Sequence, residues 1–138
     1  MGSSFTLKKN ERITSRLLMD VLFNSKASKA VTAFPLRVVY AETERHGNDA
    51  SVQVLFSVSK RHFKHAVDRN RVKRQLREAY RHNKTIIPEV ADGRQLLIAF
   101  IWLTDRHHKS EKVTAAVIKG LTKIAASTLS TDETQQSL

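Results

Sequence analysis

Hydrophobic and polar positions alternate along the chain in two different periods, which predict three helices and three strands. Apolar residues that recur every three or four positions predict helices, and short apolar runs bounded by polar residues predict strands. The order α-β-β-α-β-α, with no internal repeat, is typical of one α+β domain with a small sheet. The six segments are Thr14–Phe23 (helix), Phe34–Tyr40 (strand), Val52–Val58 (strand), Ala66–Arg81 (helix), Gln95–Leu103 (strand) and Val113–Ile124 (helix).

We expect a single domain over residues 1–138, with flexible ends at 1–10, which is basic, and at 127–138, which is polar. The hydrophobic fraction of 41% fits an ordinary folded core. The absence of cysteine excludes a disulfide framework, a Cys-ligated zinc site and a thiol nucleophile. No apolar run reaches the roughly 18–20 residues of a membrane span, so we expect a cytoplasmic protein without a membrane partner.

The formal net charge of +11 indicates a polyanionic partner. The positive charge is concentrated in one segment: Lys60–Lys84 contains ten Lys and Arg residues and only two acidic ones. The rest of the chain carries a surplus of only three positive charges. The predicted function therefore depends on this segment.

On a helix over Ala66–Arg81, Val72, Leu76 and Ala79 share one face, with Tyr80 at its edge. The opposite face carries Asn70, Lys73, Arg74, Arg77 and Arg81. A solvated helix face usually mixes both signs of charge, whereas like charges four residues apart cost a few tenths of a kcal/mol each. Arg also suits bidentate contact with phosphate. We interpret this face as a nucleic-acid surface, with a merely solvated face as the alternative. DNA is disfavoured because no helix-turn-helix, zinc or zipper pattern is present.

The order of residues in Ser57–Tyr80, SVSKRHFKHAVDRNRVKRQLREAY, resembles the most recognisable stretch of the bacterial ribonuclease P protein family. That family shows S-V-[SP]-K-[KR], a short loop, A-V, and then R-N-R-x-K-R-x-x-R-E. The resemblance extends more weakly over about residues 5–125. It implies a left-handed β-α-β crossover that carries the basic helix, against the usual right-handed rule.

The resemblance implies a small subunit of a ribonucleoprotein endonuclease that removes the 5′ leader from precursor tRNA. The RNA subunit would hold the catalytic centre and most of the Mg²⁺, so we expect no catalytic residue, cofactor or metal ligand in this chain. The residues implied to bind the RNA subunit are Lys64, Arg69, Asn70, Arg71, Lys73, Arg74, Arg77 and Arg81. Those implied to bind the leader of precursor tRNA are Met19, Phe23, Ser57, Ser59, Lys60 and Arg61.

Several alternatives stay open from the sequence. Phe23 fits either a leader contact or the core, and Trp102 fits the core or the edge of the sheet. The spacing His62-x-x-His65 could form half of a metal site, although no further ligand stands at a convincing distance. The same basic helix could belong to a ribosomal or RNA-assembly protein. A protein-only nuclease would need clustered carboxylates or a His-centred acid–base pair, and the sequence offers neither.

Overall fold

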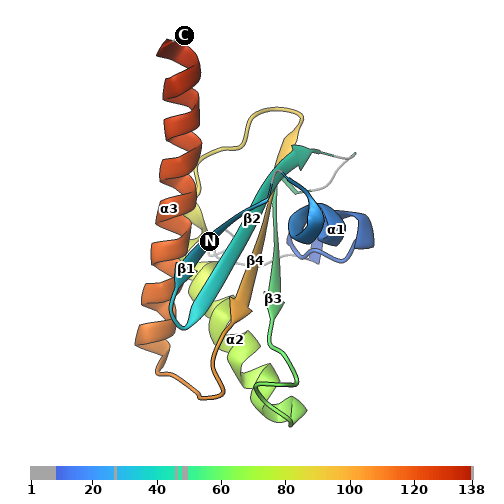
Figure 1. Ribbon diagram of the computed structural model, residues 1–138, viewed down its shortest axis with the longest axis vertical. Coiled ribbons are helices and arrows are strands. Elements are labelled where there is room, and N and C mark those ends of the chain that lie inside the picture. Colours follow the sequence, from blue (N-terminus) through green and yellow to red (C-terminus); the bar gives the residue numbers. More distant parts are fainter. Residues whose placement is uncertain (1–8, 27, 46, 48–49, 138) are drawn as a thin grey trace, which may run out of the picture.

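A four-stranded sheet, with strand order β1-β2-β4-β3, separates one helix on one face from two helices on the other (Figure 1). The computed structural model describes residues 9–26, 28–45, 47 and 50–137, with only the backbone described for residues 10 and 128–137. The helices are α1 (Arg16–Asn24), α2 (Ala66–Asn83) and α3 (Ser110–Ser137), with short 3-10 turns at Lys9–Glu11 and Lys84–Ile86. The strands are β1 (Lys29–Ala33), β2 (Leu36–Glu44), β3 (Val52–Ser57) and β4 (Arg94–Trp102).

The predicted α+β order is confirmed, and the structure adds one strand, β1, before the first predicted strand. β1 pairs with β2 in an antiparallel hairpin whose turn is Phe34–Pro35, so these two residues precede β2 and do not begin it. The signal for β1 in the sequence is weak because this edge strand reads KAVTA and buries only its last residue fully. A five-residue edge strand that is mostly exposed lacks the apolar run on which strand prediction depends.

Helix α1 begins at Arg16, two residues after the predicted start at Thr14. The Ser15 hydroxyl caps it by accepting a hydrogen bond from the Leu18 N–H, at 3.4 Å. Leu18 and Leu22 are buried against one face of the sheet, with Val39 of β2 and Leu97 of β4. The other side of α1, including Leu17, points to solvent. The helix is therefore fixed to the sheet by a narrow apolar stripe.

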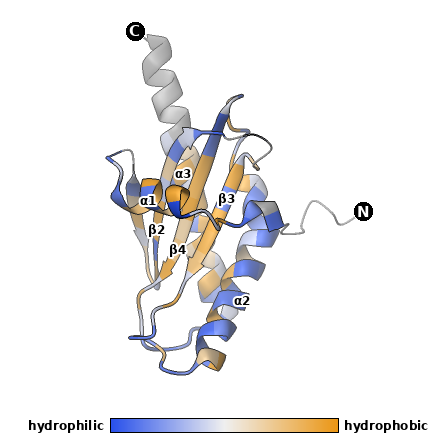
Figure 2. Ribbon diagram, turned by 90° about the vertical axis from the view of Figure 1, so that its right-hand side faces the viewer, coloured by the Kyte–Doolittle hydropathy of each residue, from blue (hydrophilic) through white to orange (hydrophobic). Residues whose placement is uncertain are grey.

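The connection β3-α2-β4 joins two parallel neighbouring strands by a left-handed crossover. Viewed from the α1 side with both strands running downward, β4 lies to the left of β3, and α2 lies on the far face (Figure 2). This arrangement agrees with the expectation from the family resemblance and is opposite to the usual right-handed rule. As in a crossover of either hand between parallel strands, the N-terminus of α2 lies beside the carboxyl ends of β3 and β4.

The main core lies between the sheet and the pair α2 and α3. Val72, Leu76, Ala79 and Tyr80 of α2 are buried there, which confirms the predicted apolar face. Trp102 is also buried in this cluster, so its interpretation as a core residue is correct.

Helix α3 crosses the sheet closely at Gly120, where an added Cβ would lie 2.8 Å from Cγ2 of Val38. A larger residue at this position would push α3 away from β2. Helix α3 also continues to Ser137, although the sequence suggested a flexible tail from Ser127. A polar stretch without Gly or Pro contains nothing that stops a helix, and the flexibility of residues 127–138 stays a prediction. Most of the start predicted to be flexible, residues 1–8, lies outside the described residues.

Candidate nucleic-acid interface

The side of α2 away from the core presents polar and cationic side chains along its length. Asn70, Arg71 and Arg74 are exposed, and Lys73 is half-buried. The buried stripe on the core side fixes the rotation of the helix, so this face cannot turn inward without exposing Val72 and Leu76. Successive cations at this spacing can follow the phosphates of a nucleic-acid strand.

Arg69 differs from its neighbours because its guanidinium is tied to the protein's own backbone. Its Nη1 donates to the carbonyl oxygens of Phe63 at 2.8 Å and of Lys64 at 3.0 Å. These bonds hold the loop that precedes α2 against the first turn of the helix. Arg69 therefore has a positioning role that its sequence motif does not reveal, while Lys64 keeps an exposed side chain.

We expect Arg69→Ala to lower the free energy of unfolding by about 1–3 kcal/mol, because two backbone carbonyls lose a charged hydrogen-bond donor. Thermal or urea unfolding of the purified protein measures the change. The matched control is Arg71→Ala, two residues along, whose exposed side chain should leave stability nearly unchanged. Equal stabilities of the two variants would contradict the positioning role.

Two cations near the C-terminal end of α2 are less available for binding RNA than the sequence suggests. Arg81 pairs with Glu78 through Nε–Oε2 at 2.8 Å and Nη2–Oε1 at 2.9 Å. The hydrogen bond from Arg81 is the main reason that the pKa of Glu78 lies below its usual value, and the positive charges of Arg81, His82 and Arg77 lower it further. Arg77 is half-buried. The strongest cationic surface therefore lies over the first half of the helix.

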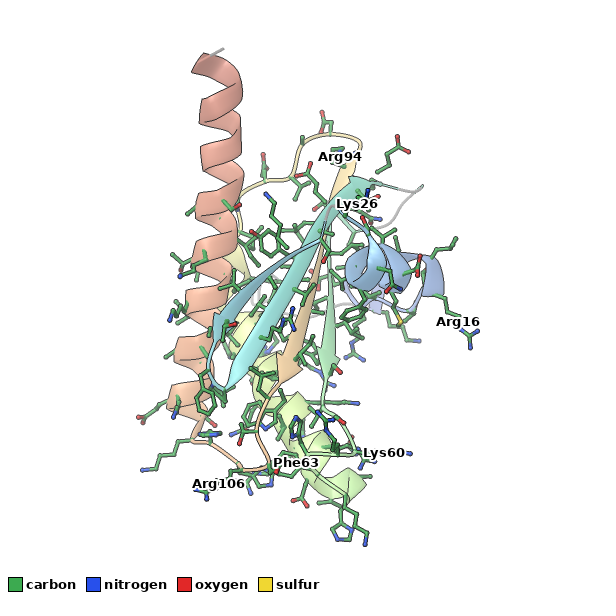
Figure 3. All side chains as sticks on the ribbon, in the orientation of Figure 1. Arg16, Lys26, Lys60, Phe63, Arg94 and Arg106 are labelled. Carbon is green, nitrogen blue, oxygen red and sulfur yellow. The ribbon has the colours of Figure 1, made fainter. Side chains whose placement is uncertain are left out.

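The loop 104–109 supports the N-terminal end of α2. The His62 ring nitrogen Nδ1 lies 2.6 Å from Asp105, and His107 Nε2 lies 3.0 Å from Asp68. The Phe63 ring stacks on His107 with ring centroids 4.6 Å apart. Figure 3 shows Lys60, Phe63 and Arg106 together at this end of the molecule. His62 thus makes a hydrogen bond to Asp105 of the loop 104–109, and His65 precedes α2 as an exposed N-cap.

The α1 face of the sheet forms a second candidate surface. Ser57, Ile101 and Arg37 lie in register across β3, β4 and β2, on the face that Leu97 and Ala99 share with α1. A hollow of about 280 Å³ lies beside this row. It is lined by Phe23, Ser28, Lys29, Ala30, Arg37, Val39 and Ile101.

Phe23 is 44% exposed, so the alternative that it is a core residue is wrong. Met19 is half-buried against the cluster under α1. Arg37 and Lys29 were missed by sequence reasoning, although Arg37 is the one cation within an otherwise apolar strand. A single Arg within an apolar strand could have indicated this surface, because an exposed cation in a central strand has to face a solvent-filled space.

The remaining predicted leader contacts lie at the carboxyl end of β3. Ser59, Lys60 and Arg61 form an exposed turn in which the Ser59 hydroxyl accepts the Arg61 N–H at 3.0 Å. The structure does not bring this turn into the hollow beside Phe23. The predicted leader residues therefore form two separate groups. One lies on the α1 side of the sheet, and the other lies at the carboxyl end of β3.

Two further features concern the part of the chain that the structure describes. No three His, Asp or Glu side chains there lie close enough together to hold a metal ion. No helix within the same residues is long and apolar enough to cross a membrane.

Comparison with known protein families shows which proteins are similar to this chain. The family model for ribonuclease P matches residues 7–125. The ribonuclease P protein component of Porphyromonas gingivalis is 40% identical over 125 residues, which cover 89% of both chains. This chain belongs to the ribonuclease P protein family.

Two solved ribonuclease P proteins share the fold. The protein from Thermotoga maritima superposes with a TM-score of 0.58 at 23% identity, covering 82% of this chain and 96% of its own. The protein from Staphylococcus aureus gives the same TM-score of 0.58 at 20% identity, covering 83% of this chain and 94% of its own.

Family membership decides among the hypotheses that the sequence left open. Ribonuclease P proteins are subunits of a ribonucleoprotein endonuclease that matures the 5′ end of tRNA, and catalysis resides in the RNA subunit. The alternatives of a ribosomal or assembly protein and of a protein-only nuclease are therefore set aside. The partners are the ribonuclease P RNA and precursor tRNA.

Proposed function

We propose that this ribonuclease P protein binds its RNA subunit through the outward face of α2 and the 5′ leader of precursor tRNA on the α1 side. The proposed RNA-subunit contacts are Lys64, Asn70, Arg71, Lys73 and Arg74, with Arg69, Arg77 and Arg81 as supporting cations. The proposed leader contacts are Met19, Phe23, Ser57, Ser59, Lys60 and Arg61, extended by Arg37.

The observation that carries the RNA-subunit assignment is the rotation of α2. Val72, Leu76, Ala79 and Tyr80 are buried, while Asn70, Arg71 and Arg74 remain exposed in the first half of the helix, beside the exposed Val67. The positive charges on this half of α2 repel one another, and a bound polyanion would reduce that repulsion. On this face the RNA is thus contacted through its phosphates.

The leader assignment rests on the chemistry of the α1 side. A half-exposed aromatic ring beside a hollow, with Arg37 and Lys29 at the same hollow, matches the needs of a single strand. Aromatic rings stack on unpaired bases, and neighbouring cations follow the backbone. We also propose that Mg²⁺ is held mainly by the RNA and that the protein acts in the cytoplasm.

Reconstitution tests the proposal. Precursor tRNA is incubated at low Mg²⁺ with the protein, with the ribonuclease P RNA, and with both. We expect no cleavage by the protein alone, slow cleavage by the RNA, and clearly faster 5′ maturation by the mixture. Cleavage by the protein alone, or no acceleration by it, would overturn the proposal. A mixture containing Arg71→Ala/Arg74→Ala protein controls for nonspecific stimulation by a basic protein, because most of its positive charge remains.

A further inference from the structure

A groove between α2 and α3 lies beside the cationic face and has no role in the function described so far. Its volume is about 450 Å³, within the range of small-molecule sites. It is lined by Arg71, Arg74, Gln75, Glu78, Ala79, His82, Asn83, Ser110 and Thr114. Arg71 and Arg74 therefore border both the groove and the surface proposed to follow phosphates.

The walls of the groove are held at a fixed separation. The Gln75 side-chain amide of α2 donates to the His108 carbonyl oxygen at 3.0 Å and to the Ser110 hydroxyl at 3.3 Å, at the start of α3. Behind the groove, Leu76 and Ala79 pack in the same core as Val113 and Val117 of α3. The groove is thus part of the folded protein and needs no rearrangement to accept a ligand.

The lining combines opposite chemical characters. Arg71 and Arg74 supply positive charge at one part of the groove. One turn further along α2, the Glu78 carboxylate, held in place by Arg81, has remaining lone pairs that can accept a further hydrogen bond. Ala79 contributes a small apolar surface. A ligand that suits all three has an anionic group, hydrogen-bond donors and a flat apolar ring. A nucleotide has these features, whereas a phosphate alone leaves the acceptor and the apolar part of the groove unused.

We propose that the groove binds one unpaired nucleotide of the RNA subunit, with its phosphate at Arg71 and Arg74 and its base between α2 and α3. The inference rests on the proposed binding of the RNA subunit to α2. It adds contacts to Ser110 and Thr114 on a helix that the cationic face does not include. Unpaired bases of structured RNA are commonly recognised in this way, by displacement from the stack and hydrogen bonding at their edges.

Filling the groove tests this inference without changing charge. Thr114→Phe places a ring in the groove, and Thr122→Phe places the same ring on the exposed side of α3. We expect Thr114→Phe to weaken RNA-subunit binding about tenfold with an unchanged salt dependence, because no phosphate contact is lost. Thr122→Phe should bind as the unaltered protein does. Equal affinities of the two variants would overturn the inference, while failure of the unaltered protein to bind the RNA would overturn the proposed function instead.

A second measurement keeps the test independent of folding defects. Backbone amide shifts of the unaltered protein are followed by NMR during titration with guanosine 5′-monophosphate, inorganic phosphate or an oligoglutamate peptide. We expect the nucleotide to shift the amides of Ser110 and Thr114, and phosphate to leave them in place. Equal shifts with phosphate, or shifts with the acidic peptide alone, would contradict a nucleotide site.

Discussion

Replacing Arg71 and Arg74 together with alanine will weaken binding of the ribonuclease P RNA about 20-fold at 0.15 M salt. Each phosphate contact contributes roughly 0.7–0.9 to the slope of log affinity against log salt, so the slope should fall by about 1.4–1.8. Both side chains are exposed on the outward face of α2, so their removal leaves the core intact. Fluorescence or filter-binding titrations over a range of salt concentrations measure both quantities.

The matched control removes the same charge from another helix. Lys119→Ala/Lys123→Ala changes two exposed lysines of α3 outside the cationic face and the groove. This variant should keep a slope close to that of the unaltered protein. If both double variants lose affinity equally, net charge is sufficient to explain binding, and the specific face on α2 is wrong.

Phe23→Ala will weaken binding of precursor tRNA with a long leader by a factor of about 30, while binding of mature tRNA stays nearly unchanged. The loss corresponds to about 2 kcal/mol, within the roughly 1–3 kcal/mol that one base stacked on an aromatic ring contributes. Since Phe23 is 44% exposed beside the hollow on the α1 side, its truncation removes a surface and little core packing. Equilibrium titration of the reconstituted holoenzyme with both RNAs provides the comparison.

Leu17→Ala provides a control within the same helix, because Leu17 is 80% exposed and does not line the hollow. It should leave the preference for the leader unchanged. A Phe23→Ala protein that loses equal affinity for both RNAs, together with a lower melting temperature, would show that the ring has only a structural role.

Sequence patterns predicted the parts of the fold that depend on one-dimensional periodicity. The apolar stripe Val72, Leu76 and Ala79 was sufficient to define the buried face of α2, and the helix predicted over Thr14–Phe23 matches α1 to within two residues at each end. β1 was missed because its sequence is short and mixed. The left-handed crossover could not follow from periodicity, since hydrophobic spacing contains no information about handedness.

The sequence predicted which types of residue belong to the candidate site, but it predicted less well how their side chains are arranged. The motif predicted cations on α2, but it did not distinguish Arg71, which is exposed, from Arg69, which holds two backbone carbonyls. It also gave no sign of Arg37, whose place beside Phe23 depends on the pairing of β2 with β4. Contacts between distant segments require the fold itself.

The sheet places α1 and α2 on opposite faces, and its central strand β4 is buried from Gln95 to Phe100. Such a layer is close-packed and resists compression. If each side holds its own RNA, the protein acts as a rigid spacer that keeps two polyanions a constant distance apart. The exposed turn at Ser59–Arg61 follows β3 and leads toward α2. If both RNAs reach this turn, the charges of Lys60 and Arg61 would reduce the repulsion between substrate and RNA subunit.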